Sequence, residues 1–243
     1  MKNMRKAIAM IELIFAIVIM GIILMSAPML ISTASKSGYV AMQQEAINEA
    51  AAQVNMILGH YWDENNVNET EDSIILQTEG DAGLNEANIT GSLTGRRAGT
   101  PTTSLRTFLT SDGVRLNASA LGDDANETLE EHKDDMDDFD DSTGLTEIQV
   151  SPDANYIETT TINIDRNVTY MGDAPGGGTY LDPTADNKLT FSDPFSAGLP
   201  SGTTNIKQIS VTLTSTSTAD ELEKKIVLRA FTCNIGSYRL EER

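Results

Sequence analysis

The sequence is poor in the residues that build covalent cross-links, metal sites and nucleophilic catalytic sites. It contains one cysteine, Cys233, and two histidines, His60 and His132, among 243 residues. A single cysteine excludes an intrachain disulfide framework and a cysteine-based zinc site. Two histidines leave little material for a histidine-ligated metal or a histidine-based catalytic triad, and no other residue set supports catalysis. We therefore expect no enzyme activity.

Positive charge is also scarce. The chain has 17 lysines and arginines against 36 aspartates and glutamates, which gives a formal net charge of −19. Because a nucleic-acid binder needs a basic face to displace counterions from phosphates, this balance argues against a nucleic-acid partner. The charge is unevenly spread: residues 8–31 carry only Glu12, whereas residues 36–243 carry 35 acidic and 14 basic side chains. The sequence predicts an apolar rod joined to an acidic head.

The apolar run of residues 8–31 follows a short basic segment, residues 1–7. As an α-helix the run would measure about 36 Å, enough to cross a hydrocarbon core of about 30 Å. The basic flank predicts a cytoplasmic N-terminus. Residues 32–34 resemble a signal-peptide cleavage site, so a cleaved signal peptide and a plain membrane anchor are two alternatives. Neither accounts for Glu12, because a carboxylate inside an apolar membrane helix is costly and usually marks a functional site.

The residues from Lys6 to Leu13 (KAIAMIEL) resemble the processing signature of type IV prepilins. In that family a short basic leader ends in a small residue, where a dedicated membrane peptidase cuts and methylates the new N-terminus, and the fifth mature residue is Glu. The resemblance implies cleavage between Ala7 and Ile8, N-methylation of Ile8, and an assembly role for Glu12. Ala7 stands where the family usually has Gly, and Ile8 where it usually has Phe. Both keep small-then-apolar chemistry, so we expect processing.

The resemblance also implies partners and a location. In the pilin family the Glu12 carboxylate would pair with the N-terminal amine of a neighbouring subunit and set the register of assembly. The partners would be prepilin peptidase, other pilin or pseudopilin subunits, an inner-membrane assembly platform and, before assembly, membrane lipid. The chain would sit in the inner membrane with a periplasmic head and then enter a filament, as a minor pilin or as a pseudopilin of a type II secretion system. The alternative is a secreted or membrane-anchored acidic module with an ordinary signal peptide that binds Ca²⁺ or carbohydrate.

The implied architecture is an α+β pilin fold, in which one long N-terminal helix packs its second half on an antiparallel sheet. We divide the chain into a leader (1–7), a membrane or filament-core half-helix (8–35), an amphipathic half-helix (36–62) and a β-rich head (63–243). The helix is expected to end between Gly59 and Trp62. The residues predicted to form its apolar stripe are Val40, Ile47, Ala50, Ala51, Val54, Ile57, Leu58 and Tyr61.

In the head, β-branched runs predict strands, and Gly-, Thr-, Asp- and Pro-rich stretches predict loops. The last two strands should pair as antiparallel neighbours. A helix or helical turn is expected at 124–136, and long loops at 79–104 and 172–205. The predicted strands are 73–78, 156–164, 167–171, 206–214 and 225–232.

The densest acidic run, residues 134–141, supplies candidate ligands for calcium, which prefers oxygen donors. The candidates are Asp137, Asp138, Asp140 and Asp141. The spacing does not match an EF-hand, and a solvated acidic loop is the alternative. The aromatic cluster of residues 60–62 is interpreted as the end of a helix packed on a sheet, with a ligand-binding cluster as its alternative. Residues 176–178, three glycines, lack the rest of a phosphate loop and predict a turn.

Overall fold

The computed structural model describes most of the chain and assigns it to the α+β class. It describes residues 2–66, 74–89, 92–97, 100–101, 103–104, 106–122, 133–140, 146–150, 160–180, 188–191, 200–215 and 222–236. The regular elements are α1 (Lys2–Ile57), η1 (Glu64–Asn66), η2 (Ala82–Leu84), β1 (Glu86–Ile89), β2 (Ser92–Arg97), η4 (Asp137–Phe139), β3 (Thr146–Val150), β4 (Thr160–Tyr170), β5 (Ile206–Ser215) and β6 (Ile226–Cys233).

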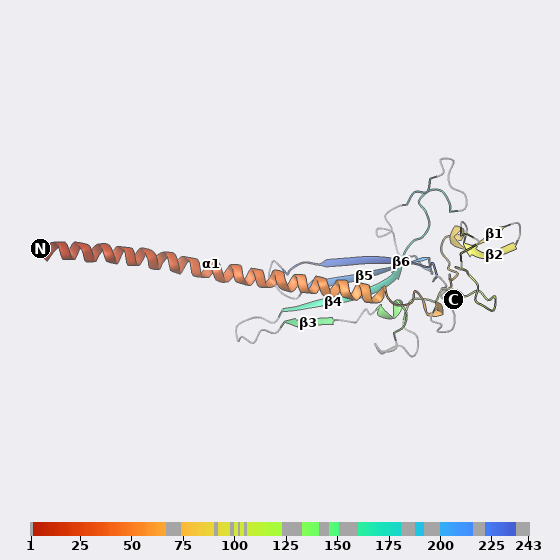
Figure 1. Ribbon diagram of the computed structural model, residues 1–243, viewed down its shortest axis with the longest axis horizontal. Coiled ribbons are helices and arrows are strands. Elements are labelled where there is room, and N and C mark those ends of the chain that lie inside the picture. The colour runs from red at the N-terminus through yellow and green to blue at the C-terminus, as the bar shows by residue number, and fades with distance from the viewer. Residues whose placement is uncertain are drawn as a thin grey trace.

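The helix α1 is a continuous rod of 56 residues that projects far beyond the head (Figure 1). At 1.5 Å per residue it is about 84 Å long. Pro28 lies inside the helix without ending it, although proline removes one backbone donor. The helix ends at Ile57, slightly before the expected range. There Gly59 N–H donates to the Met56 carbonyl at 2.9 Å, one residue tighter than an α-helical bond, which closes the last turn.

The second half of α1 packs on β5 and β6. Ala46, Ala50 and Ile57 are buried, which confirms the amphipathic character of this half. The predicted stripe is wrong for Val40, Leu58 and Tyr61, which are exposed. Successive residues of an α-helix point about 100° apart around its axis. Tyr39 and Met42 lie on the face that packs on the sheet, and Val40 therefore points away from it.

The sheet has four strands in the order β3-β4-β5-β6, with every neighbouring pair antiparallel. The predictions of β5, of β6 and of their pairing are confirmed. β4 is one unbroken strand where the sequence predicted two, and residues 156–159 lie outside the described part. The break expected around Asp165 and Arg166 is absent because the alternation of exposed and buried side chains continues through them: Asp165 is exposed and Arg166 is buried. Arg166 lies on the helix side of the sheet, where its Nη1 donates to Gln53 Oε1 at 3.4 Å.

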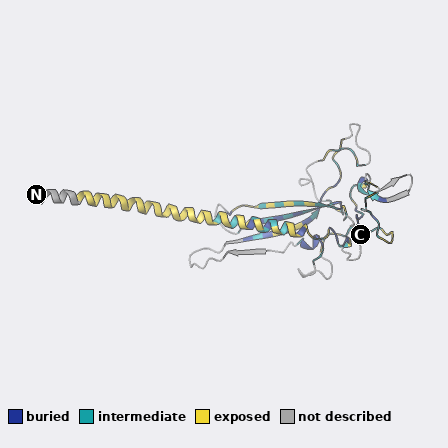
Figure 2. Ribbon diagram, viewed as in Figure 1, coloured by how far each residue is buried: buried dark blue, intermediate teal, exposed yellow. Residues whose placement is uncertain are grey.

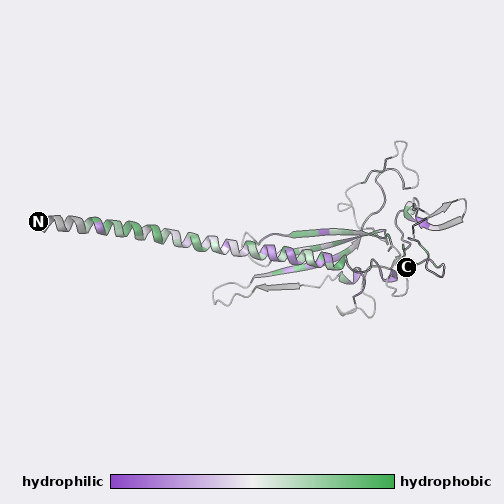
Figure 3. Cartoon of the chain, in the orientation of Figure 1, coloured by the Kyte–Doolittle hydropathy of each residue, from purple (hydrophilic) through white to green (hydrophobic). Residues whose placement is uncertain are grey.

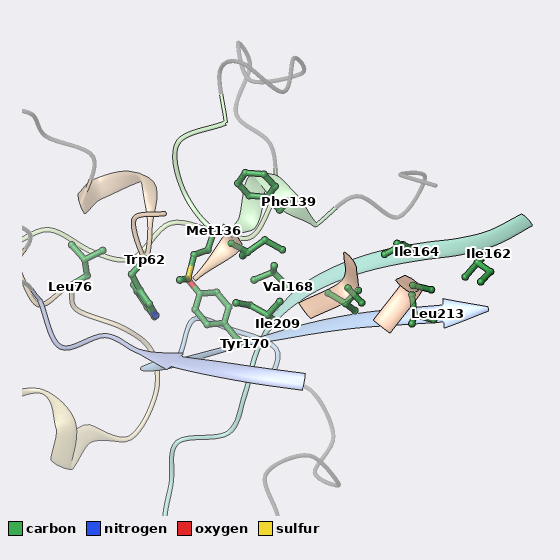
Figure 4. Close-up of a cluster of buried hydrophobic side chains, with 14 of the residues drawn as sticks. Trp62, Leu76, Met136, Phe139, Ile162, Ile164, Val168, Tyr170, Ile209 and Leu213 are labelled. Carbon is green, nitrogen blue, oxygen red and sulfur yellow. The ribbon is translucent and has the colours of Figure 1, made fainter. Parts of the chain in front are cut away.

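The core lies between α1 and the inner face of the sheet (Figure 4). On β5 the inward positions Lys207, Ile209, Val211 and Leu213 are all buried. They alternate with more exposed residues, as a strand with one covered face requires. Each fully buried aliphatic side chain contributes about 1.5–3 kcal/mol to folding. Lys207 is the charged member of this otherwise apolar row.

The predictions for the rest of the head were less accurate. Within the segment predicted as a strand at 73–78, residues 74–78 form only an isolated parallel bridge, between Gln77 and Asn117, and their other backbone bonds go to loops and to one side chain. Ile75 N–H donates to the Thr107 carbonyl at 2.8 Å, and the Asn234 side chain bonds both the N–H and the carbonyl of Leu76. The β1–β2 hairpin lies inside the predicted loop 79–104, and β3 was not predicted at all. Within the predicted helix 124–136, residues 133–136 are not helical and residues 124–132 lie outside the described part.

Candidate functional site

The first half of α1 presents an apolar surface to the outside along its whole described length. Every large apolar side chain from Met10 to Ile31 is more than half exposed. Figure 2 shows this stretch as a continuous exposed rod, and Figure 3 shows that it is also the most hydrophobic part of the helix. By length and composition this helix can cross a membrane. Exposed apolar surface of this extent is unfavourable in water and marks an interaction site with lipid or protein.

Glu12 is the only charged residue of this apolar surface. It is exposed, and it lies on the same rod face as apolar neighbours one helical turn away. Phe15 and Ala16 are such neighbours, and the sequence has the uncharged Ile8 and Ala9 at the same spacing before Glu12. Ala7 and Ile8, the expected cleavage site, lie in the first turns of α1, and their side chains lie outside the described part. The chain itself therefore offers Glu12 no charge of opposite sign within a turn of the helix.

The acidic run at 134–141 is not a solvated loop over its described length. Asp135, Asp137 and Asp138 are buried and hydrogen-bonded to protein groups. Asp138 Oδ2 accepts from the N–H groups of Asp134 and Asp135, each at 3.0 Å. Asp140 Oδ1 accepts from Asn167 Nδ2 at 2.9 Å. The interpretation as a solvated loop is therefore wrong for these residues.

The candidate calcium ligands do not converge on one point. Asp137 and Asp138 point to different protein partners, and Asp141 lies outside the described residues. Within the described ranges there is no group of three or more His, Cys, Asp or Glu side chains that could hold a metal ion. The calcium site stays a prediction, and this geometry does not support it.

Asp137 instead belongs to a buried cluster around Lys207, which we call the Lys207 cluster: Lys207, Asp63, Asp135, Asp137 and Tyr170. The Lys207 ammonium contacts the Asp137 carboxylate and lies 3.5 Å from Asp63 Oδ2. It also donates to the Trp62 carbonyl at 2.7 Å. The Tyr170 hydroxyl donates to the Ser119 carbonyl at 3.0 Å and lies 3.4 Å from Asp63 Oδ2. Three segments distant in sequence, the residues that follow α1, η4 and β5, thus meet at one lysine.

The Lys207 cluster holds three carboxyl groups but one ammonium, and two of the carboxyl groups, Asp135 and Asp137, have raised pKa values. Burial, reinforced by the charge of Asp137, raises the pKa of Asp135 to about 8. Burial also raises the pKa of Asp137, although Lys207 opposes that shift. The pKa of Tyr170 is raised by burial first and then by the neighbouring Asp63. At neutral pH one proton is therefore retained on the Asp135–Asp137 pair.

The sequence analysis did not identify this cluster. One signal was available: in β5 the period-two alternation that turns Ile209, Val211 and Leu213 inward also turns Lys207 inward. A lysine at a core position requires an acidic partner, and that requirement could have been read from the strand alone. The identity of the partners could not, because Asp63 and Asp137 lie 144 and 70 residues away.

Of the aromatic residues 60–62 that follow α1, only Trp62 belongs to the core, as interpreted from the sequence. Its ring is buried 6.1 Å from the ring of Tyr170, and the half-buried His60 has its ring tilted by 48° at 4.6 Å from that of Phe139. Tyr61 is 46% exposed and contributes little to the core. Gly178 has a φ of +81°, which agrees with the turn predicted at the three glycines.

Comparison with family models, with curated proteins and with solved structures gives no match for this chain.

Proposed function

We propose that the chain is a structural subunit of a type IV pilus or of a type II secretion pseudopilus. Its first half-helix would anchor it in the inner membrane and then, after processing, join the helical core of a filament. The observation that carries the proposal is one helix with two different halves. The half from Met10 to Ile31 is apolar, exposed and interrupted only by Glu12, and the half that follows packs on the sheet of the head.

The exposed half-helix has two environments in which its apolar surface is covered. In the membrane, acyl chains surround it. In a filament, the same surface packs against the half-helices of neighbouring subunits, where packing and hydrogen bonds hold apolar helices together. After processing, the helix of residues 8–57 would be about 75 Å long and would reach well beyond its head, which lets many copies bundle their first halves while the heads stay outside.

Glu12 would give this packing its register. A lone carboxylate costs roughly 2.5–3.5 kcal/mol near the centre of a bilayer, and a positive partner offsets that cost. Cleavage between Ala7 and Ile8 creates such a partner, because it exposes a charged amine at Ile8. The resemblance to prepilins implies that Glu12 pairs with the amine of a neighbouring chain, so that the same pair forms at each contact between subunits.

The first test is the N-terminus of the membrane-extracted protein produced together with a prepilin peptidase. The proposal expects a chain that begins with N-methylated Ile8, measured by mass spectrometry of the N-terminal peptide. A soluble chain that begins at Ser35 contradicts the proposal and favours the acidic binding module. In that alternative the ligand would bind in an open cavity of about 790 Å³ in the head, which is lined in part by Gln77, Glu79 and Asn117.

The second test separates processing from assembly. Glu12→Ala and Glu12→Gln are expected to leave cleavage intact and to abolish incorporation into filaments, measured by shearing and immunoblotting of the filament fraction. Glu45→Ala is the matched control, because Glu45 is an exposed glutamate of the same helix beyond the apolar surface. Normal incorporation of the Glu12 variants would remove the assembly role.

A further inference from the structure

The Lys207 cluster contains an amine and a carboxyl group in contact inside the protein. The side chain of Lys207 has no exposed surface and that of Asp137 has 3%. The amine is confined on its other sides, because Nζ lies 4.7 Å from the centre of the Trp62 ring and 5.4 Å from the centre of the Tyr170 ring. A nucleophile held against an acyl group in this way reacts as an intramolecular partner, with a large gain in effective concentration.

Of the two carboxylates beside Lys207, Asp137 is the more reactive acceptor. The Asp63 carboxylate lies 3.5 Å away and is held by other donors. Ser119 N–H donates to its Oδ2 at 3.0 Å, and Asn65 N–H donates to its Oδ1 at 3.2 Å. These bonds stabilise the Asp63 anion, which resists attack. The second oxygen of Asp137 accepts a longer bond from the Gly122 N–H, at 3.4 Å.

Asp135 is a third group of the cluster that could carry a proton between Lys207 and Asp137. The Asp135 carboxyl lies beside that of Asp137, and the two interact strongly enough to shift each other's pKa. It is fixed in place, because its Oδ1 accepts from the N–H groups of Asp137 and Asp138 at 2.8 and 3.3 Å. Its raised pKa means that it holds a proton at neutral pH and can exchange it with a reacting neighbour.

We propose that Lys207 and Asp137 join in an intramolecular isopeptide bond, with Asp135 as the group that carries the proton. The inference goes beyond the proposed function, because the bond would form in the head whether or not the chain assembles. The reaction starts from the contact pair, in which a proton passes from the ammonium to the carboxylate. Burial raises the pKa of the Asp137 carboxyl and so favours its protonated form.

The chemistry balances without a further reagent. The neutral Lys207 Nζ attacks Cγ of Asp137, and the new C–N bond forms while the carbonyl π bond opens. Asp135 stabilises the resulting oxygen by its hydrogen bond, takes the second proton from nitrogen and delivers it to the departing hydroxyl. The C–O bond breaks, one water leaves, and Asp135 ends in its starting protonation state. Neither group is oxidised or reduced.

The test is peptide mapping of the full-length protein extracted in detergent. Trypsin cannot cut after an acylated lysine, so the bond predicts a branched peptide in which residues 134–166 are joined to residues 189–224, lighter than the sum of the two by one water. The linear peptides 134–166 and 189–207 should disappear correspondingly. Recovery of these linear peptides at full mass overturns the proposal. A branch that joins residues 37–96 to 189–224 overturns the assignment to Asp137, because it would contain Asp63.

Two variants test the assigned roles. Lys207→Arg keeps the positive charge but removes the amine, and its linear peptides should return at full mass. Asp135→Asn keeps the size of the side chain but removes the transferable proton, so no branched peptide should form and the linear peptides should be recovered. Circular dichroism confirms that this variant is folded. A branched peptide at wild-type yield in Asp135→Asn overturns the role of Asp135. The wild-type map alone decides whether the bond exists.

Discussion

The two ends of this molecule treat a charge among apolar residues in opposite ways. In the first half of α1 a single carboxylate, Glu12, stands on an exposed apolar rod with no opposite charge within a turn of the helix. In the head a single buried ammonium, Lys207, contacts Asp137 and lies 3.5 Å from Asp63, so that its charge is compensated inside the chain. The rod has no counter-charge for Glu12 within a turn of the helix, whereas the head supplies the counter-charges of Lys207 from its own residues.

The difference indicates what each region is for. A charge left uncompensated on an apolar surface is costly in lipid, and its cost falls when another molecule supplies the counter-charge. The charge of Lys207 is instead compensated by residues of the same chain, and this pairing fixes the segments that carry them. Removing Lys207 leaves the buried carboxylates of Asp63 and Asp137 unpaired. The rod is thus suited to association, and the Lys207 cluster holds the end of α1, η4 and β5 together.

The comparison is tested most severely by removing the buried cation. Lys207→Met keeps an unbranched side chain of nearly the same length but leaves Asp63 and Asp137 without a counter-charge, and breaking a buried pair in this way costs about 3–5 kcal/mol. In a chain that already carries the isopeptide bond, the variant instead loses a cross-link over 70 residues, which stabilises by about 4 kcal/mol in the chain-entropy picture. The free energy of unfolding of the full-length protein in detergent, measured by urea denaturation, reports the change.

Lys225→Met is the matched control for this experiment, because Lys225 is exposed and precedes β6. A surface substitution of this kind should change the free energy of unfolding by no more than about 0.5 kcal/mol. If the Lys207 variant is no less stable than the Lys225 variant, the head does not depend on its buried charge and the contrast with the rod breaks down.

A smaller effect should appear as a pH dependence that the rod does not have. Asp135 keeps its proton in the folded protein up to about pH 8, whereas it ionises near its ordinary pKa of 3.8 when unfolded. Between these values the folded state binds more protons, so the free energy of unfolding falls as pH rises. Asp135→Asn should flatten this slope, and the exposed Asp112→Asn should not. Urea midpoints across that pH window check the sign, and a stability that rises with pH would contradict it.

The sequence revealed the parts of the fold that repeat a pattern and missed those that depend on single long-range contacts. The rod, β5 and β6 follow from hydropathy and alternation, which need only neighbouring residues. The strand expected at 73–78 failed because the same β-branched run also suits an extended segment held by the Asn234 side chain, 158 residues away from Leu76. Glu12 could be singled out because it interrupts an apolar run. Asp63 and Asp137 could not, because nothing local distinguishes an aspartate that meets a lysine from one that meets water.

The contact between Asn234 and Leu76 gives the mildest of the three tests in the head, since it involves no formal charge. Asn234 Oδ1 accepts from Leu76 N–H at 3.0 Å, and its Nδ2 donates to the Leu76 carbonyl at 2.6 Å, so the side chain replaces a missing strand. Asn234→Ala leaves both buried backbone groups without this partner and should cost about 1–3 kcal/mol. Asn117→Ala, at an exposed position, is the control. Hydrogen exchange at the Leu76 amide should accelerate in the Asn234 variant alone, and unchanged exchange would mean that the segment is held by its apolar contacts and not by this side chain.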